Sequence, residues 1–313
     1  MKNFIKKILS FFLIDIKIQT KKSKLLAWGL HENYQKINSN QLLLKDFDLI
    51  INPIEHEFLL LGFNLLKNLK DEFNATAYFN KEKKLVIEIQ NLSYNVQTYE
   101  ELFILSEIFN QGVYNIALNE NFILFDIGMN VAMTSLFLAS RSNCIEVNAF
   151  EPFTKTYDQA LYNISLNPNI KDKININNFG LGNGNYSITV TYDATIKGNM
   201  GINGVPKHLE NKKTSTDEII EIKDAFTILN GIITNLGNTS TKRILKIDCE
   251  GAEYEIFDSL RNSNLLSGFD ILMIEWHYKG PETIVEDLNN AGFKHFSFNE
   301  KNRSAGMIYA FKF

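Results

Sequence analysis

Two acidic residues follow predicted strands at positions where a parallel sheet binds ligands. Asp126, Gly128 and Asn130 share one turn, and Glu151 ends the next predicted strand. A glycine lets a ligand approach the backbone closely, and a carboxylate can accept hydrogen bonds from both hydroxyls of a ribose. This pair of turns therefore predicts an adenosine-binding site. A nicotinamide dinucleotide would need a G-x-G-x-x-G turn, whereas this turn has one glycine, so S-adenosylmethionine fits better.

A second acidic segment, 248–253, directly follows a predicted buried strand. It places Asp248 and Glu250 at the ligand-binding edge of the sheet, where burial and mutual repulsion raise the pKa of a carboxylate. The next strand ends with Glu275 and His277 at the same edge. These four side chains are the candidate catalytic residues. His277 is the first choice for a general base, because an ordinary histidine pKa of about 6.5 leaves the imidazole neutral; Asp248 is second and Glu250 third.

Two other chemistries use the same region. Asp248, Glu275 and His277 offer ligands for a hard divalent cation, but we favour a site without metal, because carboxylates beside a sulfonium already have an electrostatic role. Cys249 is not expected to act as a nucleophile, since the neighbouring acids raise the pKa of its thiol. With Cys144 as the only other cysteine, no disulfide framework can form, and the cytoplasm is the simplest compartment.

Strands and helices alternate from residue 122 onward, the pattern of a parallel sheet with helices on both faces. The strands are predicted at 122–125, 145–150, 174–179, 244–247, 271–275, 295–298 and 308–311, with a short extra strand at 187–192. The helices are predicted at 131–141, 156–166, 253–260 and 282–291. The glycine-rich stretch 193–217 is too long for a simple connection and is predicted to fold over the crevice, with His208 as a further candidate for substrate contact.

Three motifs occur in the order found in the FkbM family of S-adenosylmethionine-dependent methyltransferases. Asp126 to Ala132 resembles its Asp-x-Gly-x-Asn-x-Gly turn, and Phe150-Glu151-Pro152 resembles its Phe-Glu-Pro stretch. Lys246 to Glu253 resembles its Lys-Ile-Asp-x-Glu-Gly-x-Glu block, the most discriminating of the three. The one departure is an alanine at position 132, where the family usually has glycine.

The resemblance implies a doubly wound, Rossmann-like class I methyltransferase sheet of seven strands that closes in an antiparallel hairpin. It implies methyl transfer from S-adenosylmethionine, mostly to hydroxyl oxygens of sugars, glycans or other small molecules. The implied adenine site lies around 180–183. The cofactor-binding residues are thus predicted to be Asp126, Gly128, Asn130, Glu151 and Leu181. The alternative is a non-catalytic binding or scaffold protein with this fold, which only the alanine at 132 favours.

Residues 1–97 lie outside the resemblance and are predicted to form a small α+β accessory region ahead of a methyltransferase domain at 98–313. The accessory region is predicted to contain a buried helix over 57–69 and a hairpin formed by 75–79 and 84–89. A single helix from 99 to 111 should lead into the methyltransferase domain, with Gly112 as its C-terminal cap.

Charge is distributed unevenly along the chain. Lys and Arg number 32 and Asp and Glu number 36, a net charge of −4 that disfavours a nucleic-acid partner. Seven lysines against one aspartate make the segment 1–24 basic, around an apolar stretch at 8–14 that is too short to span a bilayer. We expect a docked amphipathic helix there rather than a weak membrane-surface contact.

Overall fold

The computed structural model describes residues 33–38, 40–202, 204, 215–237, 240–299 and 304–312. The predicted amphipathic segment 1–24, most of the stretch 203–214 with His208, and the centre of the closing hairpin at 300–303 lie outside the described residues.

The chain divides into two compact units, 1–90 with 96–106 and 91–95 with 107–313. The first unit contains β1 (Tyr34–Lys36), β2 (Leu42–Leu44), β3 (Leu49–Ile51), α3 (Glu57–Leu61), α4 (Phe63–Phe73), β4 (Thr76–Phe79), β5 (Leu85–Ile89) and α5 (Tyr99–Ser106). The antiparallel pairing of β4 with β5 confirms the predicted hairpin. The domain boundary predicted at residue 97 stays a prediction. The division into compact units does not follow it strictly, because Asn91–Asn95 belong to the second unit.

Two helices of the sequence analysis are interrupted. The single helix predicted over 57–69 is wrong, because Gly62 ends α3 and begins α4. A side chain at this glycine would lie 2.6 Å from Leu102 Cδ1, so close packing of α5 accounts for the glycine. The helix predicted over 99–111 is α5 followed by a π-helical turn at Glu107–Gln111, and Gly112 ends it with a φ of +67°.

A seven-stranded sheet forms the centre of the second unit, in the order β15-β16-β14-β13-β7-β8-β9. Its strands are β7 (Phe122–Ile127), β8 (Cys144–Phe150), β9 (Ile174–Asn177), β13 (Lys242–Ile247), β14 (Ile271–His277), β15 (Lys294–Asn299) and β16 (Ala305–Phe311). Only β16 runs antiparallel to its neighbours β14 and β15; the other pairs are parallel. This order confirms the predicted doubly wound class I methyltransferase sheet.

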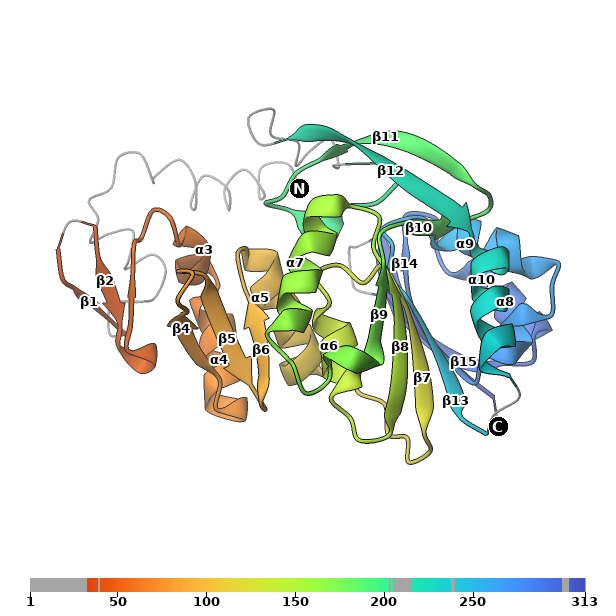
Figure 1. Ribbon diagram of the computed structural model, residues 1–313, viewed down its shortest axis with the longest axis horizontal. Helices are drawn as coiled ribbons and strands as arrows, with labels where there is room; N and C mark the ends of the chain where they lie inside the picture. The colour runs from red at the N-terminus through yellow and green to blue at the C-terminus, as the bar shows by residue number, and fades with distance from the viewer. Residues whose placement is uncertain are drawn as a thin grey trace. The chain divides into compact units, whose positions relative to one another are not determined.

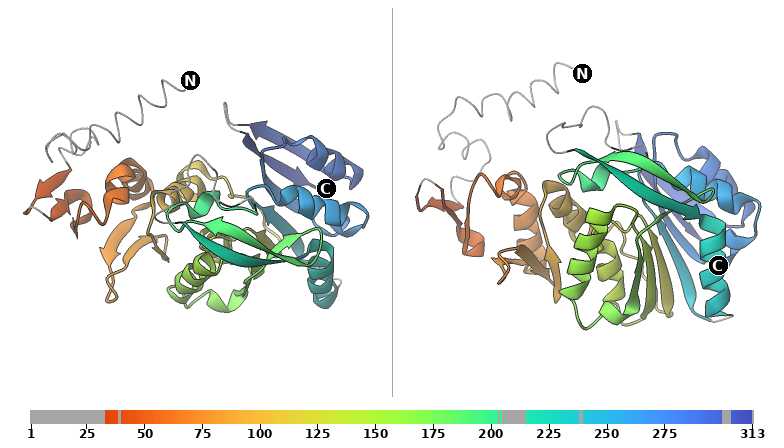
Figure 2. Two further views of the ribbon diagram at one scale, coloured as in Figure 1. Left: turned by 90° about the horizontal axis from the view of Figure 1, so that it is seen from above. Right: turned by 45° about the horizontal axis from the view of Figure 1, so that its top comes forward.

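Helices cover both faces of this sheet, as Figure 1 and Figure 2 show. On one side lie α6 (Met133–Ala139) and α7 (Thr154–Ser165), and on the other lie α8 (Ala225–Leu236), α9 (Glu253–Arg261) and α10 (Glu282–Asn290). Alternate residues of β7, such as Phe125 and Ile127, pack with Ile256 and Phe257 of α9 in the main core. All six residues of β7 are buried, as expected for a strand covered on both faces.

A smaller sheet lies across the carboxyl edge of the large one (Figure 1). It contains β10 (Gly180–Gly182), β11 (Tyr186–Tyr192) and β12 (Thr216–Asp224), with β12 in the middle. The residue pattern predicted β11 but neither β12 nor α8. A signal for α8 was present, because Asp224 caps that helix by accepting a hydrogen bond from the Thr227 amide at 2.8 Å.

Candidate active site

The turn after β7 brings two backbones into direct contact. Gly128 has a φ of +78°, and a Cβ at this position would lie 1.8 Å from the carbonyl oxygen of Asp248, at the end of β13. A side chain is therefore excluded twice, by conformation and by space. The amide of Gly128 donates to the carbonyl of Phe150 at 3.1 Å, which ties the turn to the end of β8.

The helix α6 begins in strained backbone. Asn130 and Ala132 have φ values of 53° and 65°, and the alanine is the N-cap of α6 and fully buried. Left-handed backbone costs about 1–2 kcal/mol for a residue with a Cβ, which explains why glycine is usual at this position of the motif. Alanine at this position therefore carries a backbone cost, and its methyl group is accommodated in the core.

Glu151 has a buried carboxylate that lines a cavity formed in part by the turns after β7 and β13, which we call the first cavity. Its Oε2 accepts the Asn130 amide and its Oε1 accepts the Phe153 amide, both at 3.0 Å. Burial raises the pKa of Glu151 to about 7, although both amides favour the anion. Each oxygen keeps room for a further donor, as recognition of a diol requires.

Most residues predicted for the cofactor line this same cavity. Its walls include Gly128, Asn130, Glu151 and Leu181, together with Asp248, Glu250 and residues of the glycine-rich stretch, namely Lys197, Gly198, Met200, Gly201 and Ile202. Gly201 packs on Glu250 so closely that a Cβ there would lie 2.2 Å from its carbonyl oxygen. The described part of the long stretch thus contributes directly to the cavity wall.

Asp126 was predicted to bind the cofactor, but it does not line this cavity. It is fully buried, and its carboxylate contacts Lys246 Nζ at 3.0 Å and accepts from Ser135 Oγ at 2.6 Å. The same ammonium donates to the Gly128 carbonyl at 2.7 Å and lies 3.7 Å from Asp248. Asp126 therefore fixes Lys246, and Lys246 fixes both turns that form the cavity.

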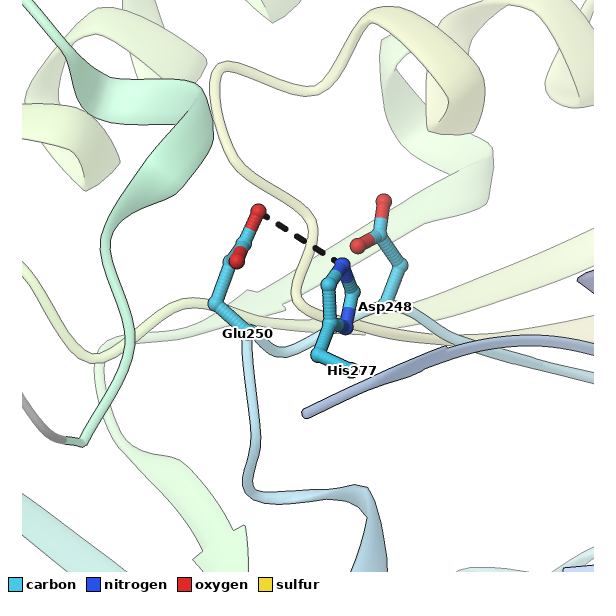
Figure 3. Close-up of side chains that lie close together, drawn as sticks. All are labelled: Asp248, Glu250 and His277. Atoms are coloured by element: carbon cyan, nitrogen blue, oxygen red, sulfur yellow. Dashed lines mark ion pairs between the residues drawn. The ribbon is translucent and has the colours of Figure 1, made fainter. Parts of the chain in front are cut away.

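His277 ends β14 among carboxylates (Figure 3). Its Nδ1 lies 3.1 Å from Oε1 of Glu253, a fully buried side chain that also accepts the His277 amide at 2.5 Å. Its Nε2 lies 3.6 Å from Glu250 Oε1 and 3.6 Å from Glu275 Oε1. Asp248 completes the group, with its Oδ2 3.3 Å from the hydroxyl of Tyr114.

This environment changes the ionisation of the predicted base. Burial alone would lower the pKa of His277, but Glu253 and Glu275, with the further charges of Glu250 and Asp248, raise it to about 12. The expectation of an ordinary histidine pKa is therefore wrong, because the imidazole is cationic at neutral pH. Burial raises the pKa of Glu250 to about 8 against the opposing charge of His277. Burial and neighbouring acids likewise raise the thiol pKa of Cys249, as predicted.

Sequence reasoning missed two members of the site. Glu253 belonged to a recognised motif but received no role, and its separation of 24 residues from His277 gave no local signal. Tyr114 lies 134 residues from Asp248 and outside any motif. Asp248, Glu250 and His277 each offer a ligand atom within 4.8 Å of the others, so this triad is the group of described residues best placed to hold a metal ion.

A second cavity, of about 590 Å³, lies against the opposite face of β14, β15 and β16 from α9 and α10. Alternate strand residues line it: Ile271, Met273, Glu275, Phe296, Phe298, Met307, Tyr309 and Phe311. Phe296 stacks on Tyr309 with ring centroids 4.9 Å apart, and Phe298 stacks on the same tyrosine at 6.1 Å. The facing wall is the segment 107–117, whose Val113 carbonyl accepts the Tyr309 hydroxyl at 2.8 Å.

Comparison with known proteins identifies the family. The methyltransferase FkbM domain matches residues 126–295, which is more than half of the chain and includes all three motifs. The chain belongs to the FkbM methyltransferase family. Membership makes it an S-adenosylmethionine-dependent methyltransferase.

Two curated fungal proteins are similar to this FkbM methyltransferase. Methyltransferase sdnD of Sordaria araneosa is 26% identical over 226 residues, which cover 65% of this chain and 86% of that protein. Methyltransferase 1 of Beauveria bassiana is 24% identical over 201 residues, covering 61% of this chain and 74% of its own length. A solved structure of methyltransferase FkbM from Methylobacillus flagellatus KT matches with 14% identity and a TM-score of 0.42, over 66% of this chain and 47% of that one.

The residues of the first cavity fit the cofactor of this family. Glu151 offers buried carboxylate oxygens to a ribose diol. Asn130 Oδ1 is buried and has no hydrogen-bond partner among the described residues, so it requires a donor such as the α-ammonium group of S-adenosylmethionine. Leu181 adds an apolar surface for the adenine ring.

Within the part of the chain that the structure describes, none of the helices has the length and apolar character of a membrane span.

Proposed function

We propose that this FkbM methyltransferase methylates a hydroxyl oxygen on a sugar, a glycan or another small hydroxylated acceptor. The position of Glu275 carries the proposal. Its carboxylate lines the second cavity, which we call the aromatic or acceptor cavity, and lies 3.6 Å from His277. Asp248 and Glu250 line the first cavity, which we call the cofactor cavity. One cluster of carboxylates therefore adjoins both cavities. Methylation of a hydroxyl group requires such a cluster, because a base must accept the hydroxyl proton near the transferred methyl group.

The cofactor supplies an electrophilic methyl group on a sulfonium. Glu151 holds the ribose, Asn130 faces the amino acid part, and Gly128 and Leu181 shape the cavity around the remainder. Asp126 supports this arrangement through Lys246. These assignments follow from where each side chain lies relative to the cavity.

Replacing Glu151 by alanine should weaken S-adenosylmethionine binding by about 1.5 to 3 kcal/mol, because a charge-assisted contact with two hydroxyls is lost. Calorimetric titration measures the dissociation constant. Glu221→Ala, which removes an exposed carboxylate of β12, is the matched control and should bind normally. An unchanged affinity in a folded Glu151 variant contradicts this assignment.

The same contact should make cofactor affinity depend on pH. The pKa of Glu151 is about 7, and ribose hydroxyls donate to the anion, so the affinity should fall as the pH drops below 7. The decrease approaches tenfold per pH unit and should be absent in Glu151→Gln. Titrations between pH 8 and pH 5.5 test this slope.

Methyl transfer requires that the acceptor hydroxyl lose its proton. We infer that Glu275 accepts this proton, because it is the one member of the predicted catalytic set that lines the acceptor cavity. The new oxygen–methyl bond forms as the methyl–sulfur bond breaks, and the electron pair of that bond stays on sulfur. His277 Nε2 lies 3.6 Å from carboxylate oxygens of both Glu275 and Glu250 and keeps the two side chains close together.

The aromatic cavity suits the body of a ring-shaped acceptor. Phe296 and Phe298 present stacked rings that are 54% and 48% exposed, and ring faces of sugars and aromatic compounds pack well on such surfaces. Glu107 and Gln111 in the facing wall offer polar partners for hydroxyl groups. A volume of about 590 Å³ lies within the usual range for small-molecule sites.

Phe296→Ala should raise the KM for the acceptor about 2- to 10-fold and leave cofactor affinity unchanged, because it removes one stacking surface. Steady-state kinetics with varied acceptor measure this. Phe226→Ala on α8, which truncates a 38% exposed ring outside the cavity, is the control. A Phe296 variant with the KM of the control would contradict the placement of the acceptor.

A methyl-transfer assay tests the proposed function. The full chain is incubated with ¹³C-methyl S-adenosylmethionine and a panel of methyl glucosides, disaccharides and phenols, and carbon chemical shifts distinguish oxygen-bound from nitrogen-bound methyl groups. Formation of a methyl ether supports the proposal. Methylation at nitrogen or carbon contradicts it, and cofactor binding without turnover on any acceptor supports the non-catalytic alternative.

A further inference from the structure

We propose that Asp248, Glu250 and His277 bind a hard divalent cation, such as Mg²⁺ or Mn²⁺, at the reaction centre. The inference rests on the proposed function, since it assigns the cation to the same site. Asp248 and Glu250 follow β13, and His277 ends the neighbouring parallel strand β14. Figure 3 shows both carboxylates beside the imidazole. One ligand atom of each residue lies within 4.8 Å of the others.

The orientation of His277 is the first independent support. Glu253 Oε1 lies 3.1 Å from Nδ1 of His277 and accepts a hydrogen bond from the His277 amide at 2.5 Å. The Gly251 amide donates to the other carboxylate oxygen of Glu253 at 2.8 Å. This contact with Glu253 fixes the ring and directs Nε2 towards the acids, where a bound cation would take the place of the proton that Nε2 carries in its absence. A histidine that binds metal characteristically donates its second nitrogen to a carboxylate in this way.

The distances around Nε2 are the second support. The His277 side chain is only 7% exposed, yet the nearest carboxylate oxygens, on Glu250 and Glu275, lie 3.6 Å from Nε2. Such separations exceed a hydrogen bond but are close to the spacing of two ligands on one small cation. The buried nitrogen thus lies between two carboxylate oxygens without a short hydrogen bond to either.

Charge is the third support. Four carboxylates, on Asp248, Glu250, Glu253 and Glu275, surround a single imidazole. The ammonium of Lys246 is engaged by Asp126 at 3.0 Å and lies 3.7 Å from Asp248. Two carboxylates favour a hard cation such as Mn²⁺ over soft metals, which prefer thiolate and thioether ligands.

A cation at this position would act on the acceptor. Asp248 and Glu250 line the cofactor cavity, so a hydroxyl that reaches the transferred methyl group would also reach the metal. Coordination lowers the pKa of a bound hydroxyl. Glu275, outside the ligand triad, then receives the proton, the oxygen–methyl bond forms and the sulfur retains the electron pair.

Mn²⁺ binding to the full chain tests the proposal directly. After treatment with EDTA and gel filtration, calorimetry and electron paramagnetic resonance should report one bound Mn²⁺ per chain. His277→Gln and Asp248→Asn should each weaken this binding at least 10-fold, and Glu253→Gln about 10- to 100-fold. Glu286→Gln, which removes an exposed carboxylate of α10, is the control and should bind as the native chain does.

Each variant is first checked for its melting temperature and its affinity for S-adenosylmethionine; Glu250→Gln replaces any variant that fails to fold. Failure of the folded native chain to bind millimolar Mn²⁺ while it binds the cofactor overturns the metal site and leaves the proposed function intact. Equal Mn²⁺ binding by the native chain and both ligand variants also overturns it. Loss of cofactor binding by the native chain would instead contradict the proposed function.

Discussion

Glu275→Gln should lower the turnover number by about 10²- to 10⁴-fold, the range usual for loss of a general base. Glutamine keeps the size and one acceptor oxygen of the side chain but cannot take the proton of the acceptor. Affinity for S-adenosylmethionine should remain within threefold, because Glu275 lines the acceptor cavity rather than the cofactor cavity. Single-turnover methyl transfer beside calorimetric titration measures the two quantities.

A structural role for Glu275 would give a different result. Its side chain is 30% exposed, so a merely structural substitution would change the melting temperature and reduce activity only in proportion to the folded fraction. Glu282→Gln, on the surface at the start of α10, serves as the control for removing one acid near the site. A folded Glu275 variant with native turnover would leave Asp248 or Glu250 as the proton acceptor.

Asp126→Asn should lower the free energy of unfolding by about 3–5 kcal/mol. Lys246 is 3% exposed, and without the Asp126 carboxylate its ammonium would remain buried with only the more distant Asp248 as counter-charge. Urea unfolding followed by circular dichroism measures the loss. Since Asp126 does not line the cavity, cofactor affinity of the folded fraction should change less than in the Glu151 variants.

The control for this prediction is an ion pair of similar geometry on the surface. Asp71→Asn breaks a contact of 2.9 Å with Lys67 on α4, where both side chains are more than a third exposed. Such pairs contribute less than about 1 kcal/mol. If Asp126→Asn costs no more than this exposed pair, the buried ammonium is not held as the contacts indicate.

The large sheet could be predicted from the sequence because its strands are short, apolar and separated by helical patterns. The errors arose where tertiary contacts decide. Gly62 divides one apolar helical pattern into α3 and α4, since a neighbouring leucine occupies the space of a side chain. β12 follows residues outside any recognised motif, and the exposed Ile219 beside the buried Ile220 obscures the alternation expected of a strand.

The candidate site could be predicted as a set of residues but not as an arrangement. Glu151 and Gly128 occur where the motifs place them, in one cavity wall. The ionisation of His277, in contrast, depends on Glu253 and Glu250, which pair with it only when β13 and β14 lie side by side. A ranking by ordinary pKa values therefore could not anticipate a cationic imidazole.

The contact between Gly128 and Asp248 has a mechanical consequence. No side chain separates the turn after β7 from the turn after β13. Lys246 binds the Gly128 carbonyl of the first turn and lies beside the Asp248 carboxylate of the second. The two turns must therefore move as one rigid element. New acceptors can then be accommodated during evolution by changes on β15 and β16, because β14 separates these strands from the two turns.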